Sequence, residues 1–164
     1  VIDDLQAAAG GNVGIAGVFN GCEYVSSTTG ETIFSNYWPG SGADSNFPVK
    51  AFLYDNPNQL FTICTSNVVS AANTEAEVRA AVFANIAFAT GNSGSTTTGI
   101  SSATADLNTI ATTNTLALRI MGVQDDPENS DFTAAGIPLI VRINNHFNAP
   151  TGSIAAATVS TTGV

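Results

Sequence analysis

His146 is the only histidine in the chain, so it is the only side chain whose ordinary pKa lies near neutrality and suits a general base. A hydrolytic triad would pair it with a serine or cysteine nucleophile and an orienting carboxylate. No Gly-x-Ser-x-Gly segment precedes a predicted helix, and Cys64 lacks the flanking residues typical of a cysteine nucleophile. We therefore expect no catalytic residues, and we expect His146 to be a structural or surface hydrogen-bonding residue.

An acidic segment over residues 124–135 offers oxygen ligands of the kind that Ca²⁺ prefers. Its spacing fits no EF-hand, because the central glycine and the terminal glutamate are missing. A solvated loop is the expected structure, and Asp125, Asp126 and Asp131 are the candidate ligands if a cation binds there. Glu75 and Glu77 could be considered as the paired carboxylates of a glycosidase, but they fit the first turn of a helix better.

Cys22 and Cys64 each lie in an apolar, strand-like segment, so we expect both to be buried as small hydrophobic residues. A single disulfide is the alternative. No Cys-x-x-Cys pair occurs, and no Gly-rich phosphate-binding motif opens a helix. We therefore expect neither a zinc site nor a cofactor.

Charge is scarce in this chain of 164 residues. Only 10% of the residues are charged, and 13 acidic against 4 basic side chains give a net charge of -9. Four scattered cations cannot neutralise a phosphate backbone or an anionic membrane surface, so nucleic acid and membrane are not expected partners. No apolar run approaches the ~20 residues of a membrane span, and no signal peptide is expected at the first residues.

Short β-type segments separated by turns dominate the chain. Asn20-Gly21 predicts a tight turn, and residues 26–30 predict a hairpin loop. Thr74 and Glu77 form the pattern of a capping box, which predicts a helix of two or three turns, with a bent strand as the alternative. The predicted strands are, in chain order, 13–19, 22–25, 31–35, 48–54, 60–64, 100–107, 116–123 and 137–144.

These elements predict a mainly β fold, an antiparallel β-sandwich or β-barrel with one short helix. In the last predicted strand, Ile137, Leu139, Val141 and Ile143 share one face. Residues 1–148 are expected to form a single β-rich domain, and residues 149–164 an uncharged C-terminal tail.

Five motifs, in this order, resemble the small head-decoration (cement) or minor capsid proteins of tailed bacteriophages, as found in marine and cyanobacterial phages. The resemblance spans residues 17–147. The motifs are GVFNGCEY at 17–24, YWPG at 37–40, AFLYDNPNQLFTI at 51–63, LALRIMGV at 116–123 and VRINNHF at 141–147.

The resemblance implies a non-enzymatic structural protein of the virion, made in the bacterial host cytoplasm and bound to the outer surface of an icosahedral head. Its implied partners are the major capsid protein and further copies of itself, commonly in a trimer. Aromatic side chains dominate buried contacts, so the candidate interface residues are Tyr37, Trp38, Phe52, Tyr54 and Phe147, with core packing as the alternative for each.

A carbohydrate-binding β-sandwich, such as a lectin- or adhesin-like module, is the alternative function. The Tyr37-Trp38 pair could stack on a sugar ring, and the acidic segment could hold calcium. An enzyme such as a glycosidase is the third and least supported possibility.

Overall fold

The computed structural model of the chain describes residues 15–67, 72–91, 94–95, 98–125, 127, 131–146 and 148–149. These residues form two antiparallel sheets, one of three strands in the order β2-β1-β3 and one of five strands in the order β4-β8-β7-β5-β6. The elements are β1 (Val18–Val25), β2 (Thr32–Ser35), the 3-10 helix η1 (Gly40–Gly42), β3 (Lys50–Tyr54), β4 (Leu60–Cys64), α2 (Glu75–Ala80), β5 (Asn85–Phe88), β6 (Ala105–Ala111), β7 (Leu118–Val123) and β8 (Pro138–Ile143).

The predicted fold class is confirmed, because the structure is mainly β with a single short α-helix among the described residues. Neither sheet closes on itself within the described part of the chain. Of the two predicted architectures, the structure is therefore consistent with the two-sheet sandwich and not with the barrel.

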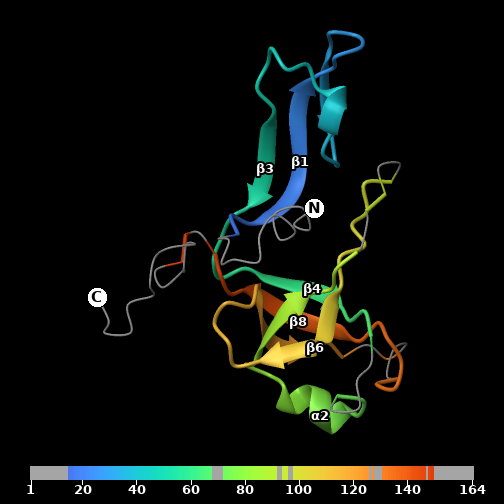
Figure 1. Ribbon diagram of the computed structural model, residues 1–164, viewed down its shortest axis with the longest axis vertical. Helices are drawn as coiled ribbons and strands as arrows, with labels where there is room; N and C mark the ends of the chain where they lie inside the picture. The colour runs from blue at the N-terminus through green and yellow to red at the C-terminus, as the bar shows by residue number, and fades with distance from the viewer. Residues whose placement is uncertain are drawn as a thin grey trace.

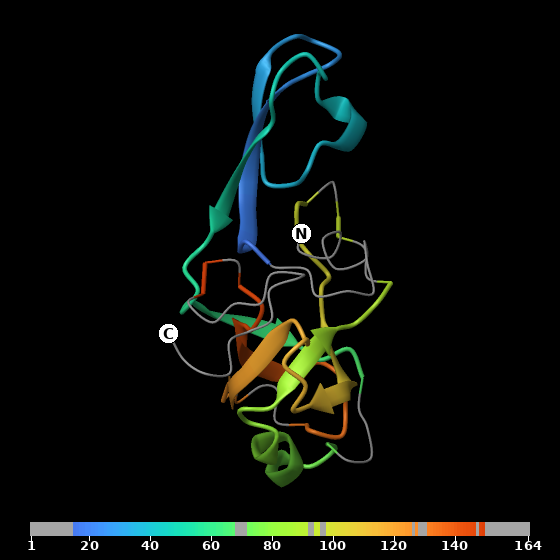
Figure 2. The same ribbon diagram turned by 60° about the vertical axis from the view of Figure 1, so that its left-hand side comes forward.

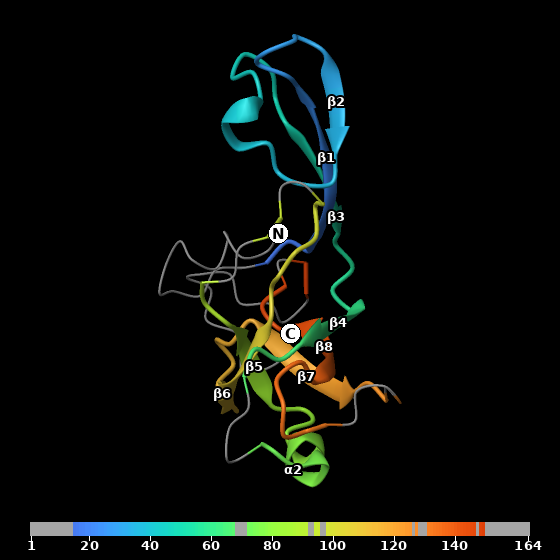
Figure 3. The ribbon, with the colours of Figure 1, turned by 90° about the vertical axis from the view of Figure 1, so that its right-hand side faces the viewer.

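The three-stranded sheet extends away from the five-stranded sheet in every view (Figures 1, 2 and 3). We call residues 18–54 the arm, and the five-stranded sheet with α2 the body. β1 and β3 run side by side along the arm (Figure 1), and at its base Val18 pairs with Tyr54. The arm thus leaves the body and returns to it at one place.

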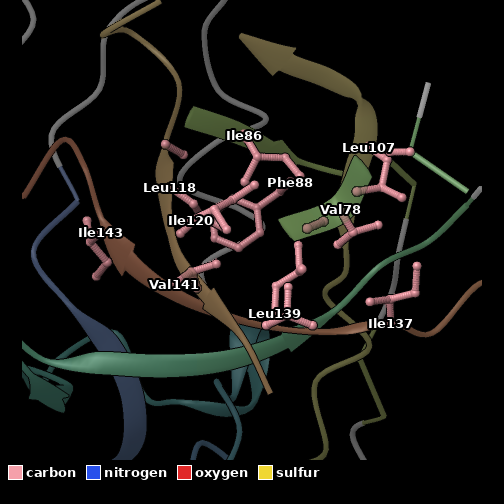
Figure 4. Close-up of a cluster of buried hydrophobic side chains, with 14 of the residues drawn as sticks. Val78, Ile86, Phe88, Leu107, Leu118, Ile120, Ile137, Leu139, Val141 and Ile143 are labelled. Carbon is pink, nitrogen blue, oxygen red and sulfur yellow. The ribbon is translucent and has the colours of Figure 1, made fainter. Parts of the chain in front are cut away.

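The hydrophobic core lies in the body, where side chains from four strands and from α2 meet (Figure 4). Ile137, Leu139, Val141 and Ile143 are all buried, as their period of two predicted. Between them, Ile140 and Arg142 are only partly buried on the opposite face. β8 therefore has one core face and one outer face.

The helix begins where the capping box predicted it. Glu77 N–H donates to Thr74 Oγ1 at 3.3 Å, and Glu77 Oε2 accepts from Thr74 N–H at 3.1 Å. Hydrogen bonds from Thr74 and Asn73 lower the pKa of Glu77. The helix has only six residues and is shorter than expected, and β5 follows it as a strand that we had not predicted.

The predicted turn at Asn20-Gly21 is wrong. β1 continues through it as one strand, and the pairing with β3 shifts register between Phe19 and Gly21, as in a β-bulge. Gly21 has a φ of 145°, and a Cβ atom there would lie 2.9 Å from the carbonyl oxygen of Ser35. This position therefore requires glycine within a continuous strand, and the glycine that predicted a turn serves the irregular pairing of β1 instead.

We predict that Leu139→Ala lowers the free energy of unfolding by about 2–5 kcal/mol, because Leu139 is fully buried and truncation leaves a cavity. Urea denaturation followed by circular dichroism measures this. Ile100→Ala is the control, since Ile100 is exposed and its truncation should change stability by less than about 0.5 kcal/mol. Equal effects of the two variants would contradict the position of the core.

His146 lies just after β8 and contacts the segment that precedes the arm. It forms a parallel bridge with Ile15, whose N–H donates to Asn145 O at 2.8 Å. Its Nδ1 accepts a hydrogen bond from Asn148 N–H at 3.0 Å, which requires that nitrogen to be unprotonated. Burial lowers the pKa of His146, and the nearby Asp55 carboxylate opposes this effect only in part. The folded protein therefore holds the neutral imidazole.

Because the folded-state pKa of His146 lies below the unfolded value of 6.5, the unfolded chain binds this proton first as the pH falls. The contribution of His146 to stability is present above pH 6.5 and is lost as the pH falls toward the folded-state pKa. We predict a larger drop in unfolding free energy between pH 7 and pH 5 for the natural chain than for His146→Asn. Parallel drops in the two proteins would show that His146 is not the titrating group.

Candidate functional site

One face of the arm is an exposed apolar surface, which we call the open face. Cross-strand pairs place Phe34 beside Glu23, and Glu23 beside Lys50. Directly paired residues lie on the same side of a sheet, and side chains two positions apart along a strand do so too. Phe52 and Tyr54 of β3 therefore share this face with Lys50. The open face consists of Glu23, Phe34, Lys50, Phe52 and Tyr54.

The three rings of the open face are unusually exposed. The exposed fraction is 71% for Phe34, 45% for Phe52 and 53% for Tyr54. Phe52 lies opposite Gly21, which contributes no side chain to cover its ring. A small sheet is stabilised by an apolar face that is covered, and exposed rings do not contribute to this stability. Exposed apolar patches of this kind commonly mark surfaces that bind another molecule.

On the other face of the arm, the loop of residues 36–46 packs against part of the sheet, while Leu53 stays 41% exposed. Trp38 packs edge-on against Phe19, with ring centroids 6.5 Å apart. The Cys22 thiol donates to the carbonyl oxygen of Tyr37 at 3.3 Å, and burial raises the pKa of that thiol. Tyr24 is also buried on this side. The loop thus covers part of this face and leaves the open face without a cover.

An ion pair lies among the aromatic rings of the open face. Lys50 Nζ is 3.1 Å from Glu23 Oε1 and stays largely exposed. Such a surface pair contributes little to stability and is screened by salt, but it fixes the orientation of two charges. The arrangement can bind a flat apolar surface with a defined register.

The predicted interface residues fall in three places. Phe52 and Tyr54 lie together on the open face, and Trp38 is half exposed on the other side of the arm. Tyr37 is partly buried beside Cys22, and Phe147 lies outside the described residues. Core packing is thereby excluded for Phe52, Tyr54 and Trp38.

Phe34 belongs to the open face and was missed by the sequence analysis. The signal that could have found the whole face is the uninterrupted apolar run Ala51–Tyr54 in a strand that has a neighbour on one side only. A strand that is apolar on both faces is buried only if another element packs on each face. In the arm, the loop of residues 36–46 packs on one face only.

Within the described residues of the acidic segment, Asp125 and Asp131 have separate partners. Asp125 Oδ1 is 2.7 Å from an Arg79 guanidinium nitrogen, and Asp131 Oδ1 accepts hydrogen bonds from Thr133, which lower the pKa of Asp131. Asp126 lies outside the described residues. Where the structure describes the chain, no three His, Cys, Asp or Glu side chains gather as a metal would require.

Both cysteines are free thiols. Cys22 is buried as expected, but Cys64 is exposed, so the prediction was wrong for Cys64. The reason is the alternation along β4, because Cys64 shares its face with the exposed residues Leu60 and Thr62, whereas Phe61 and Ile63 are partly buried. Apolar neighbours in the sequence therefore do not by themselves predict that a cysteine is buried.

A hollow of about 540 Å³ lies between the base of the arm and the body. Val18 and Phe19 of β1 line it together with Phe61 and Ile63 of β4. Its lining is mostly apolar and carries no charged side chain, so it offers no electrostatic selectivity and we assign no ligand to it. It shows that the arm meets the body without filling the space at the junction.

No helix in the described ranges is long and apolar enough to cross a bilayer. Comparison with protein-family models, with curated proteins and with solved structures finds no match for this chain.

Proposed function

We propose that this protein is a non-enzymatic structural component of a bacteriophage virion, a decoration protein that binds the outside of the icosahedral head through the open face of its arm. Its partner is the major capsid protein, and its copies associate as a trimer. The observation that carries this proposal is the set of three exposed aromatic rings on one flat sheet, together with the ordered motifs that resemble head-decoration proteins.

The physics of the surface supports binding to a repeated protein lattice. Few charged groups have to lose water when the open face is covered, and the one ion pair present is already formed. Aromatic side chains are the most frequent energetic centres of protein interfaces. Many copies on symmetric positions also multiply a modest affinity through effective concentration.

A projecting arm suits this role because it separates the binding surface from the core. The labelled core residues lie in the body (Figure 4), whereas the exposed rings belong to strands β2 and β3 of the arm. Binding energy at the arm therefore does not require any change in the packing of the body. This division allows the shell contact to form between folded molecules.

Carbohydrate binding is the second candidate, and the same three rings favour it because flat aromatic surfaces also stack against sugars. The ion pair in the middle of the open face would supply polar contacts to hydroxyl groups. A glycan array probed with and without calcium separates the two functions. Glycan binding that depends on the open face, without binding to heads, would replace the first proposal by the second.

We predict that the triple variant Phe34→Ala, Phe52→Ala and Tyr54→Ala binds heads at least about thirtyfold more weakly than the natural chain, because interface aromatics each contribute about 2 kcal/mol or more when buried. Co-sedimentation with purified heads that lack the protein measures this. Its melting temperature should stay within a few degrees, since the three rings are exposed.

Ile100→Ala is the matched control, because Ile100 is equally apolar and exposed but lies outside the arm. It should bind heads like the natural chain. Unchanged binding by the triple variant, or no binding by the natural chain itself, would reject the proposal.

A further inference from the structure

Two arginines lie directly opposite each other on the outer face of the body. Arg119 of β7 pairs in register with Arg142 of β8. Both are partly buried, and neither forms an ion pair with an acid of the described residues. Like charges at directly opposite positions repel, so this is an unfavourable arrangement unless an anion is placed between them.

The other two permanent cations are already neutralised. Lys50 lies 3.1 Å from Glu23, and Arg79 lies 2.7 Å from both Glu75 and Asp125. In a chain of net charge -9, the fold thus places its two remaining cations beside each other. Each guanidinium group carries paired N–H donors that match the two oxygens of a carboxylate.

Phe83 extends this site and is held there by an uncommon backbone. The Arg119 guanidinium carbon lies 6.0 Å from the centre of the Phe83 ring, within the range of a cation–π contact. Phe83 is 61% exposed and has a φ of 72°, a left-handed conformation that is rare for an aromatic residue. Leu60, paired with Arg142 on the other side, is 48% exposed. An apolar rim therefore surrounds the two charges.

The matching negative charge lies at the far end of the arm. Residues 26–49 contain Glu31 and Asp44 and no lysine or arginine. Asp44 N–H donates to Val25 O at 2.8 Å, and Ser26 N–H donates to Glu31 O at 2.8 Å, so both acids belong to the end of β1. We call this region the arm tip. β1 has eight residues and spans roughly 26 Å, and the tip points away from the body in all three views (Figures 1, 2 and 3).

We propose that Arg119, Arg142 and Phe83 form a carboxylate-binding site for the acidic arm tip of a second copy of this chain. The tip of one molecule lies too far from its own body to bind there, whereas the tip of a neighbour can reach it. Such a head-to-tail contact joins two different surfaces and closes into a ring when the rotation permits. The inference rests on the proposed function in one respect, because it supplies the contact between copies in the proposed trimer.

Reversal of the two charged surfaces tests the site. Arg119→Glu with Arg142→Glu, and separately Glu31→Lys with Asp44→Lys, should each weaken self-association of the full chain at least about tenfold in sedimentation equilibrium. A chain that carries all four changes restores the opposite charges and should associate like the natural protein. The natural association should also weaken as salt is added.

Arg79→Gln is the control, because it removes a cation that already has partners and leaves the site intact. It should associate normally. Circular dichroism confirms that every variant is folded.

A natural chain that is monomeric at the highest concentration measured would overturn the inference, as would full association of the Arg119 and Arg142 variant. The inference would also be overturned if the Arg119 and Arg142 variant lost association but the Glu31 and Asp44 variant did not. The arginine site would then bind a segment other than the arm tip. Head binding is measured separately. Association without head binding rejects the head-binding role and leaves this inference standing. Head binding by a monomer rejects this inference and the proposed trimer, and leaves the head-binding role standing.

Discussion

The register between β7 and β8 determines both faces of the five-stranded sheet. It places Ile120 opposite Val141 in the core and Arg119 opposite Arg142 on the outer face. Because side chains alternate along a strand, a shift of one residue would expose the core and bury the two arginines. The energy that fixes this register comes from apolar burial, so the packing of the core also fixes the two charges beside each other. The body thus derives its stability and its surface chemistry from one alignment.

The arm follows a different principle. Residues 36–46 pack against part of one face, and the open face keeps three aromatic rings exposed to water. Exposing these rings is unfavourable for the isolated molecule, and the cost is recovered when a partner surface covers them. Scarcity of charge along the chain serves the same end, since few hydrated groups oppose the approach of a neighbour. The two surfaces that we assign to binding therefore differ in kind, one apolar on the arm and one cationic on the body.

Much of the fold could be predicted from local patterns. The strand at β8, the capping box at Thr74 and the hairpin between β1 and β2 each follow from neighbouring residues. The bulge at Gly21, the strand β5 and the exposure of Cys64 could not be predicted, because they depend on which strands become neighbours. The candidate surfaces show the same limit. The aromatic residues Phe52 and Tyr54 stand out in the sequence, but the pairing of Arg119 with Arg142 joins positions 23 residues apart and needs the sheet.

The arm enters and leaves the body at adjacent points, where Val18 pairs with Tyr54 and a side chain at Gly17 would clash with the carbonyl oxygen of Tyr54. Val18 also packs against the core, and outside this junction Asn36 donates to the carbonyl oxygen of Thr98 at 3.1 Å. If these contacts are kept, the length or sequence of the arm could change during evolution while most of the hydrophobic interior stays the same. Related proteins could in this way acquire arms that bind different partners while they retain the same body.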